Sequence, residues 1–421
     1  MALKQKHFVT DPAKRLTGNQ VIKIRDLKVS FKVKDGLLQA VRGVDLTVYK
    51  GQIIGIVGES GSGKSVCVKS IIGFNDGSIV SAKDLNLSNI DIIKVNKGTW
   101  AYIRGTYVSY IPQDPLMSLN PTKTIGKQVI EAIYVSEKNR YRQQKALINQ
   151  QLKTGRDLEN KPLSQEAISF LNSELVRIKK DYLFNTRPAE AKKKVIEILK
   201  FIGIEDAQNR LKSYPHEFSG GMRQRIVIAI AVASRPDVII ADEPTTALDV
   251  TVQAKVLSLI KELREKYQIT VIFISHNIAL VANFCDYIYV MYGGKIVEQG
   301  LTEEIFVNPL HPYTWALLSS IPDSDVENQK LEPIAGTPPN LVTPPKGDAF
   351  AARNKYAVAI DFEKQPPLFE VTETHRAATW LLHPKAPKME IPKEVREKIK
   401  HFKKSFEIYV KQKKAIEMKK V

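Results

Sequence analysis

The sequence predicts an α/β protein built around a buried parallel sheet. Three short apolar runs carry this prediction, at 53–58 (IIGIVG), 237–244 (DVIIADEP) and 269–276 (ITVIFISH). Runs of this length are typical of strands that are buried on both faces. Helical patterns separate the runs along the chain. Alternating buried strands and helices favour a parallel sheet, which binds ligands where its strands end.

An antiparallel region is expected before this core. Residues 21–33 (VIKIRDLKVSFKV) and 37–52 (LLQAVRGVDLTVYKGQ) alternate polar and apolar side chains. Asp35 and Gly36 stand between them and are typical of a hairpin turn. We therefore expect two paired strands that follow a loose N-terminal arm at residues 1–20.

A helical hairpin is expected to be inserted in the domain at about residues 136–186. This segment is polar, rich in lysine and without strand signals. Ser164 is a suitable N-cap, and apolar residues follow it at helical spacing: Ile168, Leu171, Leu175 and Ile178. A further helix is expected to start near Pro188, because proline suits the first helical turn.

The C-terminal part changes in composition. Residues 331–345 (LEPIAGTPPNLVTPP) are rich in proline, which suits an extended linker rather than a helix or a central strand. Residues 386–421 hold 12 Lys/Arg against 5 Glu and are expected to form a basic helical tail. The net charge of +18 indicates an anionic partner, either nucleic acid or the inner membrane leaflet. A solvated tail is the simpler interpretation, and contact with anionic lipid is the alternative.

The overall composition is that of a globular protein with a real core, with 43% hydrophobic residues among 421. No apolar stretch reaches the roughly 18 residues that would suggest a membrane span. The basic N-terminus lacks the apolar region of a signal peptide. The chain has two cysteines, Cys67 and Cys285, which we expect to be core thiols in a reducing, cytosolic compartment.

Residues 58–65 (GESGSGKS) match the phosphate-binding pattern G-x-x-x-x-G-K-[ST]. The match follows the first buried strand and precedes a helical segment, which is the context that this motif requires. The glycines allow backbone amides to wrap a polyphosphate. Lys64 can reach the β- and γ-phosphates, and the Ser65 hydroxyl can bind Mg²⁺. The sequence therefore predicts a nucleotide site.

Two acidic residues end the second buried run. Asp242 is placed to hold the hydration shell of magnesium at the strand end. Glu243 is expected to face the opposite way along an extended chain, where it can polarise an attacking water as a general base. An isolated acidic strand end is often only solvated, so this prediction depends on the phosphate loop.

Three weaker signals accompany these motifs. Gln113 follows an apolar strand and is suited to sense water, Mg²⁺ or a γ-phosphate, and His276 ends the third apolar run. Residues 217–225 (EFSGGMRQR) place two glycines after a serine at the start of an apolar helical run. Because a helix start of this kind binds anions, the sequence predicts a second anion site in addition to the phosphate loop.

In their order along the chain these motifs resemble the nucleotide-binding subunit of an ABC transporter. GESGSGKS is similar to the family's Walker A, VIIADE to its Walker B, FSGG to its signature motif and TALD (246–249) to its D-loop. The resemblance covers about residues 20–385. It implies a P-loop NTPase ABC cassette, with a RecA-like parallel-sheet core, an antiparallel β subdomain and an inserted helical subdomain, plus a C-terminal extension.

The resemblance implies a role for each site residue. Glu243, His276 and Gln113 would be catalytic, as the general base, the switch histidine and the Q-loop residue. Ser65, Gln113 and Asp242 would hold Mg²⁺. ATP would contact an aromatic that stacks on adenine and the residues of the Walker A segment: Phe31, Gly58, Glu59, Ser60, Gly61, Ser62, Gly63, Lys64, Ser65 and Cys67.

The resemblance also implies partners. Two ATPase subunits pack head to tail in this family, so that the signature of one faces the Walker A of the other across ATP. Contacts to the partner's ATP would come from Ser219, Gly220, Gly221 and Asp249. Opening and closing of this pair, a heterodimer, would drive two integral permeases supplied by an extracellular binding protein. The subunit would be peripheral, at the cytoplasmic face of the cell membrane, and would bind no nucleic acid.

Further segments resemble the oligopeptide, dipeptide and nickel importer branch: QDPLMSLNPTKTIGKQV, YPHEFSGGMRQR, HPYTWALLSSIP and IAGTPPNL. They imply an ATPase that powers oligopeptide uptake, with dipeptides or nickel as alternative cargo. The implied boundaries are an N-terminal arm at 1–20, a nucleotide-binding domain at 21–308, an extension at 309–385 and the basic tail at 386–421.

The C-terminal extension departs from many relatives, which carry four cysteines there whose thiolates suit an iron–sulfur cluster. Asp348, Asn354, Asp361 and Thr379 stand at those places in this sequence. We therefore expect no cluster and an extension held by packing alone. ATP and Mg²⁺ are the expected cofactors.

Two other classes of protein fit less well. A non-transport ABC ATPase acting on ribosomes or DNA would agree with the positive charge. However, translation-type members carry two cassettes in one chain, and the 136–186 segment is too short for the coiled coil of DNA-repair types. A catalytically silent regulatory subunit would not need Lys64, Glu243 and His276 intact.

Overall fold

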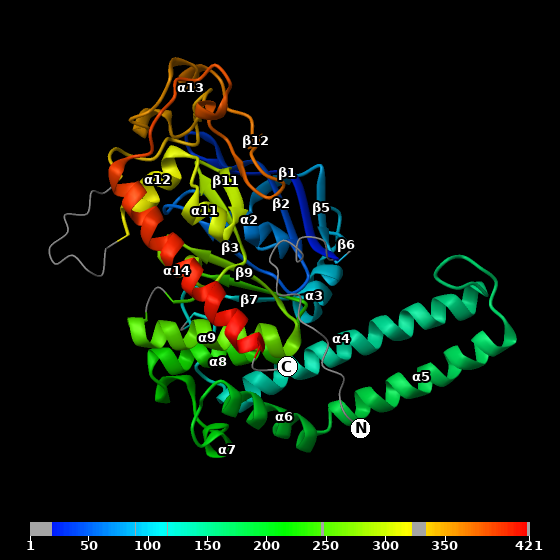
Figure 1. Cartoon of the computed structure of the whole chain (residues 1–421). Helices are drawn as coiled ribbons and strands as arrows, with labels where there is room; N and C mark the ends of the chain where they lie inside the picture. Colours follow the sequence, from blue (N-terminus) through cyan, green and yellow to red (C-terminus); the bar gives the residue numbers. More distant parts are fainter. Residues whose placement is uncertain (1–18, 89, 116, 246–247, 322–333, 419–421) are drawn as a thin grey trace. The chain divides into compact units, whose positions relative to one another are not determined.

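The computed structural model describes residues 19–88, 90–115, 117–245, 248–321 and 334–418, which form two compact units (Figure 1). Unit 1 combines the chain up to Val95 with the chain from Thr270 onward. Unit 2 comprises Asn96–Ile269. Each unit contains its own strands, helices and buried apolar side chains.

Unit 1 contains an antiparallel sheet in the order β2-β1-β5-β6, with β4 also paired to β1. Its two long strands form the predicted hairpin, in which Val33 pairs with Gly36 across the turn. The strands are β1 (Gln20–Val33), β2 (Gly36–Tyr49), β4 (Ser78–Ser81), β5 (Asp84–Leu87) and β6 (Ile90–Asp91).

Unit 1 also contains the strands β12-β13-β11-β10-β3-β9, paired in that order. β3 pairs in parallel with both β9 and β10, and every residue of these three strands is buried. The two apolar runs expected to be parallel strands here are therefore confirmed. The strands are β3 (Ile53–Val57), β9 (Thr270–Ser275), β10 (Tyr287–Tyr292), β11 (Lys295–Leu301), β12 (Phe369–Glu370) and β13 (Arg376–Ala377).

The helices of unit 1 connect these strands or follow them. The α-helices are α2 (Lys64–Ile71), α10 (Ile278–Ala282), α11 (Thr302–Val307), α12 (Pro312–Ser319), α13 (Ala359–Glu363) and α14 (Lys393–Met418). Short 3-10 turns stand at η2 (Ala351–Arg353) and η3 (Trp380–Leu382).

Unit 2 combines one parallel strand pair with a set of helices. β7 (Val108–Ile111) pairs in parallel with β8 (Val238–Asp242), which is buried throughout, as its apolar run predicts. The helices are α3 (Lys97–Thr106), α4 (Ile125–Thr154), α5 (Gln165–Asn185), α6 (Pro188–Phe201), α7 (Ala207–Arg210), η1 (Pro215–Glu217), α8 (Gly220–Ala233) and α9 (Val250–Tyr267).

The helical hairpin of unit 2 is made by α4 and α5, which run side by side (Figure 1). The Tyr141 and Tyr182 rings stack between them with centroids 4.8 Å apart. Ser164 caps α5 as predicted, because its hydroxyl accepts a hydrogen bond from the Ala167 amide. Pro188 is the first residue of α6, also as predicted. The hairpin starts earlier than the predicted residue 136. Its first helix, α4, begins at Ile125, in a stretch that is apolar rather than rich in lysine.

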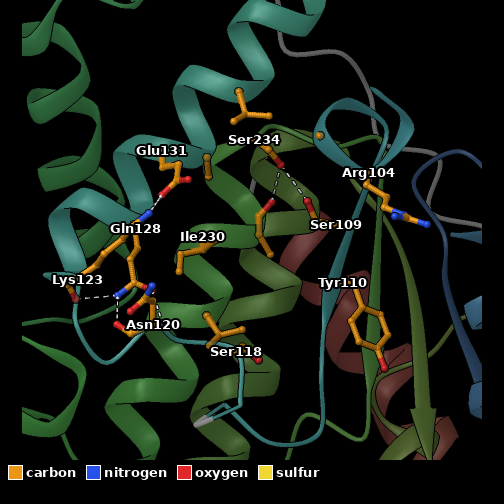
Figure 2. A pocket seen from close by; sticks show the side chains of 15 residues that line it. Arg104, Ser109, Tyr110, Ser118, Asn120, Lys123, Gln128, Glu131, Ile230 and Ser234 are labelled. Carbon is orange, nitrogen blue, oxygen red and sulfur yellow. Dashed lines mark hydrogen bonds and ion pairs between the residues drawn. The ribbon is translucent and has the colours of Figure 1, made fainter. Parts of the chain in front are cut away.

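A pocket of about 440 Å³ opens in unit 2 among α3, β7, α4 and α8 (Figure 2). Its floor combines apolar side chains such as Ile230 with polar groups that bond to one another. The Ser109 and Ser234 hydroxyls lie 2.9 Å apart, and Gln128 donates to the Asn120 carbonyl oxygen over 3.0 Å. Tyr110 of β7 also lines this pocket.

Within the C-terminal extension, residues 334–345 form neither helix nor strand, as the proline-rich composition predicts. The basic tail is helical, as expected, over α14. This helix packs on α11 through Phe402, whose ring centroid lies 4.7 Å from that of Phe306. No helix in the described ranges is long and apolar enough to cross a membrane.

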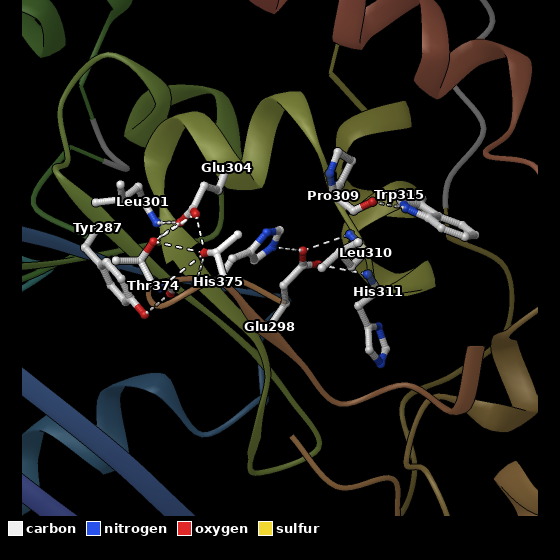
Figure 3. A network of polar contacts seen from close by, with 11 residues as sticks. Tyr287, Glu298, Leu301, Glu304, Pro309, Leu310, His311, Trp315, Thr374 and His375 are labelled. Carbon is white, nitrogen blue, oxygen red and sulfur yellow. Dashed lines mark hydrogen bonds and ion pairs between the residues drawn. The ribbon is translucent and has the colours of Figure 1, made fainter. Parts of the chain in front are cut away.

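A buried carboxylate of β11 links the residues that directly precede α12 and β13 within unit 1 (Figure 3). Glu298 accepts hydrogen bonds from the backbone amides of Leu310 (2.8 Å) and His311 (3.0 Å). The His375 Nε2 atom lies 2.8 Å from the same carboxylate. Glu298 and His375 are both fully buried, and all three bonds converge on the Glu298 carboxylate, whereas the buried His375 Nδ1 atom has no partner among the described residues.

The four residues at the expected cysteine positions are also buried. Each side chain accepts a hydrogen bond from a backbone amide two or three residues away in the chain, which is the geometry of Asx and Ser/Thr turns and of a helix cap. These bonds are local, but the extension also makes a long-range polar contact, that of His375 with Glu298, so the expectation that packing alone holds it was wrong. The pairs are Asp348 with Phe350 (3.1 Å), Asn354 with Tyr356 (2.9 Å), Asp361 with Val358 (2.8 Å) and Thr379 with Leu381 (3.3 Å).

Candidate active site

The loop at 58–63 joins β3 to α2 and has the backbone of a phosphate-binding loop. Gly58 has φ +151°, and a Cβ there would lie 2.1 Å from the Met291 carbonyl oxygen. Gly63 has φ +95°, and a Cβ there would lie 2.4 Å from the Ala40 carbonyl oxygen. Only glycine fits at these two positions, because a side chain would overlap backbone atoms of the neighbouring strands.

The donors of this loop suit a polyanion. Within the described residues, α2 has neither a side-chain cap nor an acidic residue in its first turn, and the buried Ser62 hydroxyl has no partner. Lys64 is 4% exposed, and its ammonium donates to the carbonyl oxygens of Gly58 and Glu59 over 2.8 Å each. Helix N-termini with open amides and an adjacent ammonium bind phosphate groups.

His276 stands at the same sheet edge as this loop. Val57, the last residue of β3, pairs in parallel with Ser275, the last residue of β9. The loop and the exposed His276 therefore leave adjacent strand ends. Phe31 lies in β1 of the same unit, opposite Leu38 of β2, and is half-buried.

A second pair of strand ends carries the acidic residues, in unit 2. Ile111 of β7 pairs in parallel with Ala241 of β8. Two residues beyond each of them stand Gln113 and Glu243, whose side chains meet, because the Gln113 Nε2 atom donates to Glu243 Oε2 over 3.4 Å. The structure thus brings together two of the predicted catalytic side chains.

The side chains of Asp242 and Glu243 point to different partners, but the backbone at Glu243 differs from the extended one that was expected. Glu243 is not extended: its φ is +47°, in the left-handed region that residues other than glycine rarely adopt. β8 ends at Asp242, whose carboxylate accepts a hydrogen bond from the Tyr110 hydroxyl over 2.7 Å. A turned backbone, rather than strand alternation, therefore directs the two carboxylates to different partners. Strained backbone of this kind is concentrated at functional sites.

The signature segment starts α8 as predicted. Ser219 is the N-cap, and its hydroxyl accepts a hydrogen bond from the Met222 amide over 3.4 Å. Gly220 is exposed, and a Cβ at this position would have nothing within 4 Å, whereas a Cβ on Gly221 would lie 2.8 Å from the Val252 side chain. An open Gly220 leaves the positive end of the helix accessible to an anion.

Asp249, the remaining residue expected to contact the partner's ATP, caps α9. Its carboxylate accepts a hydrogen bond from the Val252 amide over 2.9 Å. Thr246 and Ala247, the first residues of the TALD segment, lie outside the described residues.

Cys67 does not fit the nucleotide contact expected of it. Its side chain is fully buried, and burial raises the pKa of the thiol to about 12. The Cys67 amide donates to the Gly63 carbonyl oxygen over 2.9 Å, so this amide is already used in a hydrogen bond of the helix. Cys67 and Cys285 are both buried and form no disulfide, as expected of core thiols.

Two polar partners of the site escaped the sequence analysis. Tyr110 bonds to Asp242 across 132 residues, and Arg353 binds Glu59 across 294 residues. A tyrosine in a strand and an arginine in an irregular segment carry no motif that could have identified them. The described site residues divide between the units: unit 1 holds Phe31, residues 58–65 and His276, and unit 2 holds Gln113, Asp242, Glu243, Ser219, Gly220, Gly221 and Asp249.

Two family models match this chain. Residues 41–246 match the family model "ABC transporter", and residues 297–360 match "Oligopeptide/dipeptide transporter, C-terminal region". The second match contains Asp348, Asn354 and Arg353.

Curated relatives match along nearly the whole chain. The "Oligopeptide transport ATP-binding protein OppD" of Mycoplasma pneumoniae is 63% identical over 400 residues, covering 95% of this chain and 92% of the relative. The protein of the same name from Mycoplasma genitalium is 62% identical, covering 97% and 99%. The "Dipeptide transport ATP-binding protein DppD" of Lactococcus lactis is 43% identical, covering 89% and 94%. The chain therefore belongs to the ABC transporter family of ATPases, in the branch that carries the oligopeptide/dipeptide transporter C-terminal region.

Proposed function

We propose that this chain is the ATP-hydrolysing subunit of an importer that powers uptake of oligopeptides through partner permeases. The Gln113–Glu243 contact carries the catalytic part of this proposal, because it orients a carboxylate beside the strand that ends in Asp242. The cargo is supported by the names of the two Mycoplasma relatives. Dipeptides are the second candidate, since a 43% identical relative is named for dipeptide transport.

The chain's own groups would act as follows in hydrolysis. The backbone amides of residues 58–65 and the Lys64 ammonium bind the phosphates of ATP. Glu243 accepts the proton of the attacking water, and Gln113 holds that carboxylate in position. His276, which directly follows the end of β9, forms a hydrogen bond with the γ-phosphate. The reaction yields ADP and phosphate.

Magnesium is the metal that we infer for this reaction. The Ser65 hydroxyl of unit 1, and the Asp242 carboxylate and the Gln113 amide of unit 2, are hard oxygen ligands, which Mg²⁺ prefers together with waters and phosphate oxygens. Bound Mg²⁺ would neutralise charge on the β- and γ-phosphates. The Tyr110 hydroxyl orients the Asp242 carboxylate by donating a hydrogen bond to it.

A second ATPase subunit would complete the site. The exposed start of α8, at Ser219, Gly220 and Gly221, would contact the γ-phosphate of ATP held by the partner. Asp249, the N-cap of α9, would also contact the partner's ATP. ATP would then hold the two subunits together, and hydrolysis would release them. We infer a heterodimer, joined to two permeases supplied by an extracellular binding protein, with this chain peripheral at the cytoplasmic face of the membrane.

The extension would hold no iron–sulfur cluster. The side chains at the four positions are oxygen acceptors already bonded to backbone amides, whereas such clusters are held by thiolates. We retain 21–308 as the nucleotide-binding domain with its helical insertion, 309–385 as the extension and 386–421 as the tail.

Purification of the tagged full chain from membranes tests this function. We expect two integral permeases and a second ATPase to copurify, and the complex to hydrolyse ATP faster when a peptide-loaded binding protein is added. A complex that copurifies with RNA instead, and lacks permeases, would contradict the proposal.

A further inference from the structure

An ion pair joins the C-terminal extension to the phosphate-binding loop within unit 1. The Arg353 guanidinium binds the Glu59 carboxylate through two parallel bonds, Nη1 to Oε2 at 2.6 Å and Nη2 to Oε1 at 3.0 Å. The Arg353 side chain is only 5% exposed and that of Glu59 is 26% exposed. Bidentate pairs of this kind are strong and fix the relative orientation of both groups.

The remaining Arg353 donors are also satisfied. Nε donates to the Ala335 carbonyl oxygen (2.8 Å), Nη2 to that of Ile334 (3.0 Å) and Nη1 to the Tyr292 hydroxyl (3.0 Å). With the two bonds to Glu59, all five guanidinium N–H groups have an acceptor. The extension therefore holds this side chain rigidly in one orientation, aimed at the loop.

The backbone of Glu59 is in turn bonded to Tyr313 and to Lys64, the proposed phosphate-binding lysine. Its amide donates to the Tyr313 hydroxyl over 2.7 Å, and its carbonyl oxygen accepts from the Lys64 ammonium over 2.8 Å. Tyr313 packs against Tyr292 with ring centroids 4.6 Å apart. A short chain of contacts thus runs from Arg353 through Glu59 to Lys64.

The charge of Glu59 gives this pair a consequence for ligand binding. A carboxylate in a loop that binds a polyanion repels the phosphates unless a cation neutralises it. Arg353 supplies that cation from the extension, outside residues 41–246. We infer that Arg353 is a positioning residue for ATP: it neutralises and orients Glu59, so that the phosphate-binding loop accepts the triphosphate. This inference rests on the proposed function, because it presupposes that the loop binds ATP.

The test is the affinity of the purified full chain for an ATP analogue that cannot be hydrolysed. We expect Arg353→Gln to raise the Kd about tenfold, because it leaves an unpaired carboxylate beside the phosphates. We expect the same substitution to have little effect in a Glu59→Gln background, where that carboxylate is absent. The Kd penalty in the single variant should shrink at high salt, which screens the repulsion.

A matched control is available in the extension. Arg376 pairs with Glu370 over 2.8 Å at an exposed position, so Arg376→Gln makes the same charge change elsewhere. The inference predicts an unchanged Kd for this control. An equal loss of affinity in Arg376→Gln would overturn it, because the effect would then come from net charge alone.

A purely structural role for Arg353 predicts a different result: a lower melting temperature with an unchanged Kd, and this would also overturn the inference. If Arg353→Gln unfolds at the assay temperature, Arg353→Lys replaces it in the test. This variant keeps the charge but loses the two-bond contact that orients Glu59, so the inference predicts a rise in Kd that is smaller than tenfold and disappears in a Glu59→Gln background. A rise of the same size in both backgrounds would overturn the inference. Failure of the wild-type chain to bind the analogue would contradict the proposed function instead.

Discussion

The Tyr110 hydroxyl donates a hydrogen bond to the Asp242 carboxylate over 2.7 Å, between the neighbouring strands β7 and β8. Tyr110 also lines the pocket among α3, α4 and α8 (Figure 2). Burial, together with the bond to Asp242, raises the pKa of this phenol, so it remains a donor throughout the physiological pH range. The proposed metal ligand is thus held by a residue that also belongs to the pocket lining.

Loss of this hydroxyl should weaken metal binding. In Tyr110→Phe we expect the Mg²⁺ concentration that gives half-maximal ATPase activity to rise about tenfold, because partners behind a ligand orient it and set its affinity. The kcat at saturating Mg²⁺ should change little. Titration of ATPase activity with Mg²⁺ measures both quantities.

Tyr107→Phe is the control for this prediction. Tyr107 precedes β7 directly, and its hydroxyl accepts a hydrogen bond from Gln143 rather than bonding to an acidic residue. An equal shift of the Mg²⁺ midpoint in both variants would mean that the Tyr110–Asp242 bond has no specific part in metal binding.

Asp348 should make the stability of the extension depend on pH. Burial, reinforced by the nearby Asp361, raises its pKa from 3.8 to about 7, although the Phe350 amide and Arg42 act in the opposite direction. The folded state therefore holds this proton more tightly than the unfolded state. The stabilisation is complete below about pH 4 and is lost as the pH rises through 7.

Asp348→Asn removes this dependence while keeping the side-chain oxygen that accepts from Phe350. We expect the variant to exceed the wild type in free energy of unfolding by about 2 kcal/mol or more at pH 8, with a much smaller difference at pH 4. Denaturant unfolding between these pH values measures the difference. Asp181→Asn, at an exposed helical position, should leave the pH profile unchanged. Parallel profiles for wild type and Asp348→Asn would contradict the prediction.

A negative charge at the start of α8 should abolish association with the second ATPase while leaving the fold of the chain intact. Gly220 is exposed and has room for a side chain, so Gly220→Asp should fold normally, and its charge should stabilise the helix by about 0.3–1 kcal/mol. The same charge should repel the partner's ATP. We therefore expect ATP-dependent association with the second ATPase to be lost, as measured by size-exclusion chromatography with light scattering.

Gln165→Asp is the matched control, because Gln165 is the first residue of α5 and follows a capping serine just as Gly220 does. Association that persists in Gly220→Asp, or that fails equally in Gln165→Asp, would argue against a role for the α8 start in binding the partner's nucleotide.

Much of this structure could be predicted because its signals are local. The strands β3, β8 and β9 are short apolar runs, and a strand buried on both faces needs no more than that. Ser164 and Pro188 mark helix starts through bonds within a few residues. The loop at 58–63 carries its function in its own backbone, so its motif sufficed.

The unpredicted features depend on tertiary structure. The left-handed backbone of Glu243 results from the end of a buried strand, and nothing in its neighbours along the chain specifies it. Arg353 reaches Glu59 across 294 residues, a relationship that no spacing rule contains. The bonds of Asp348 and Asn354 are local, to amides two residues away. They were not predicted, because an aspartate or an asparagine alone does not show that such a turn forms.

The most direct test is ATP hydrolysis by the reconstituted complex, wild type against Glu243→Gln, with and without a peptide-loaded binding protein. We predict turnover that peptide stimulates in the wild type and that falls about 100-fold or more in the variant, as expected on loss of a general base. ATP binding should persist in the variant, since Lys64 and the loop are unchanged. Undiminished turnover in Glu243→Gln would show that the base lies elsewhere and would contradict the proposed function.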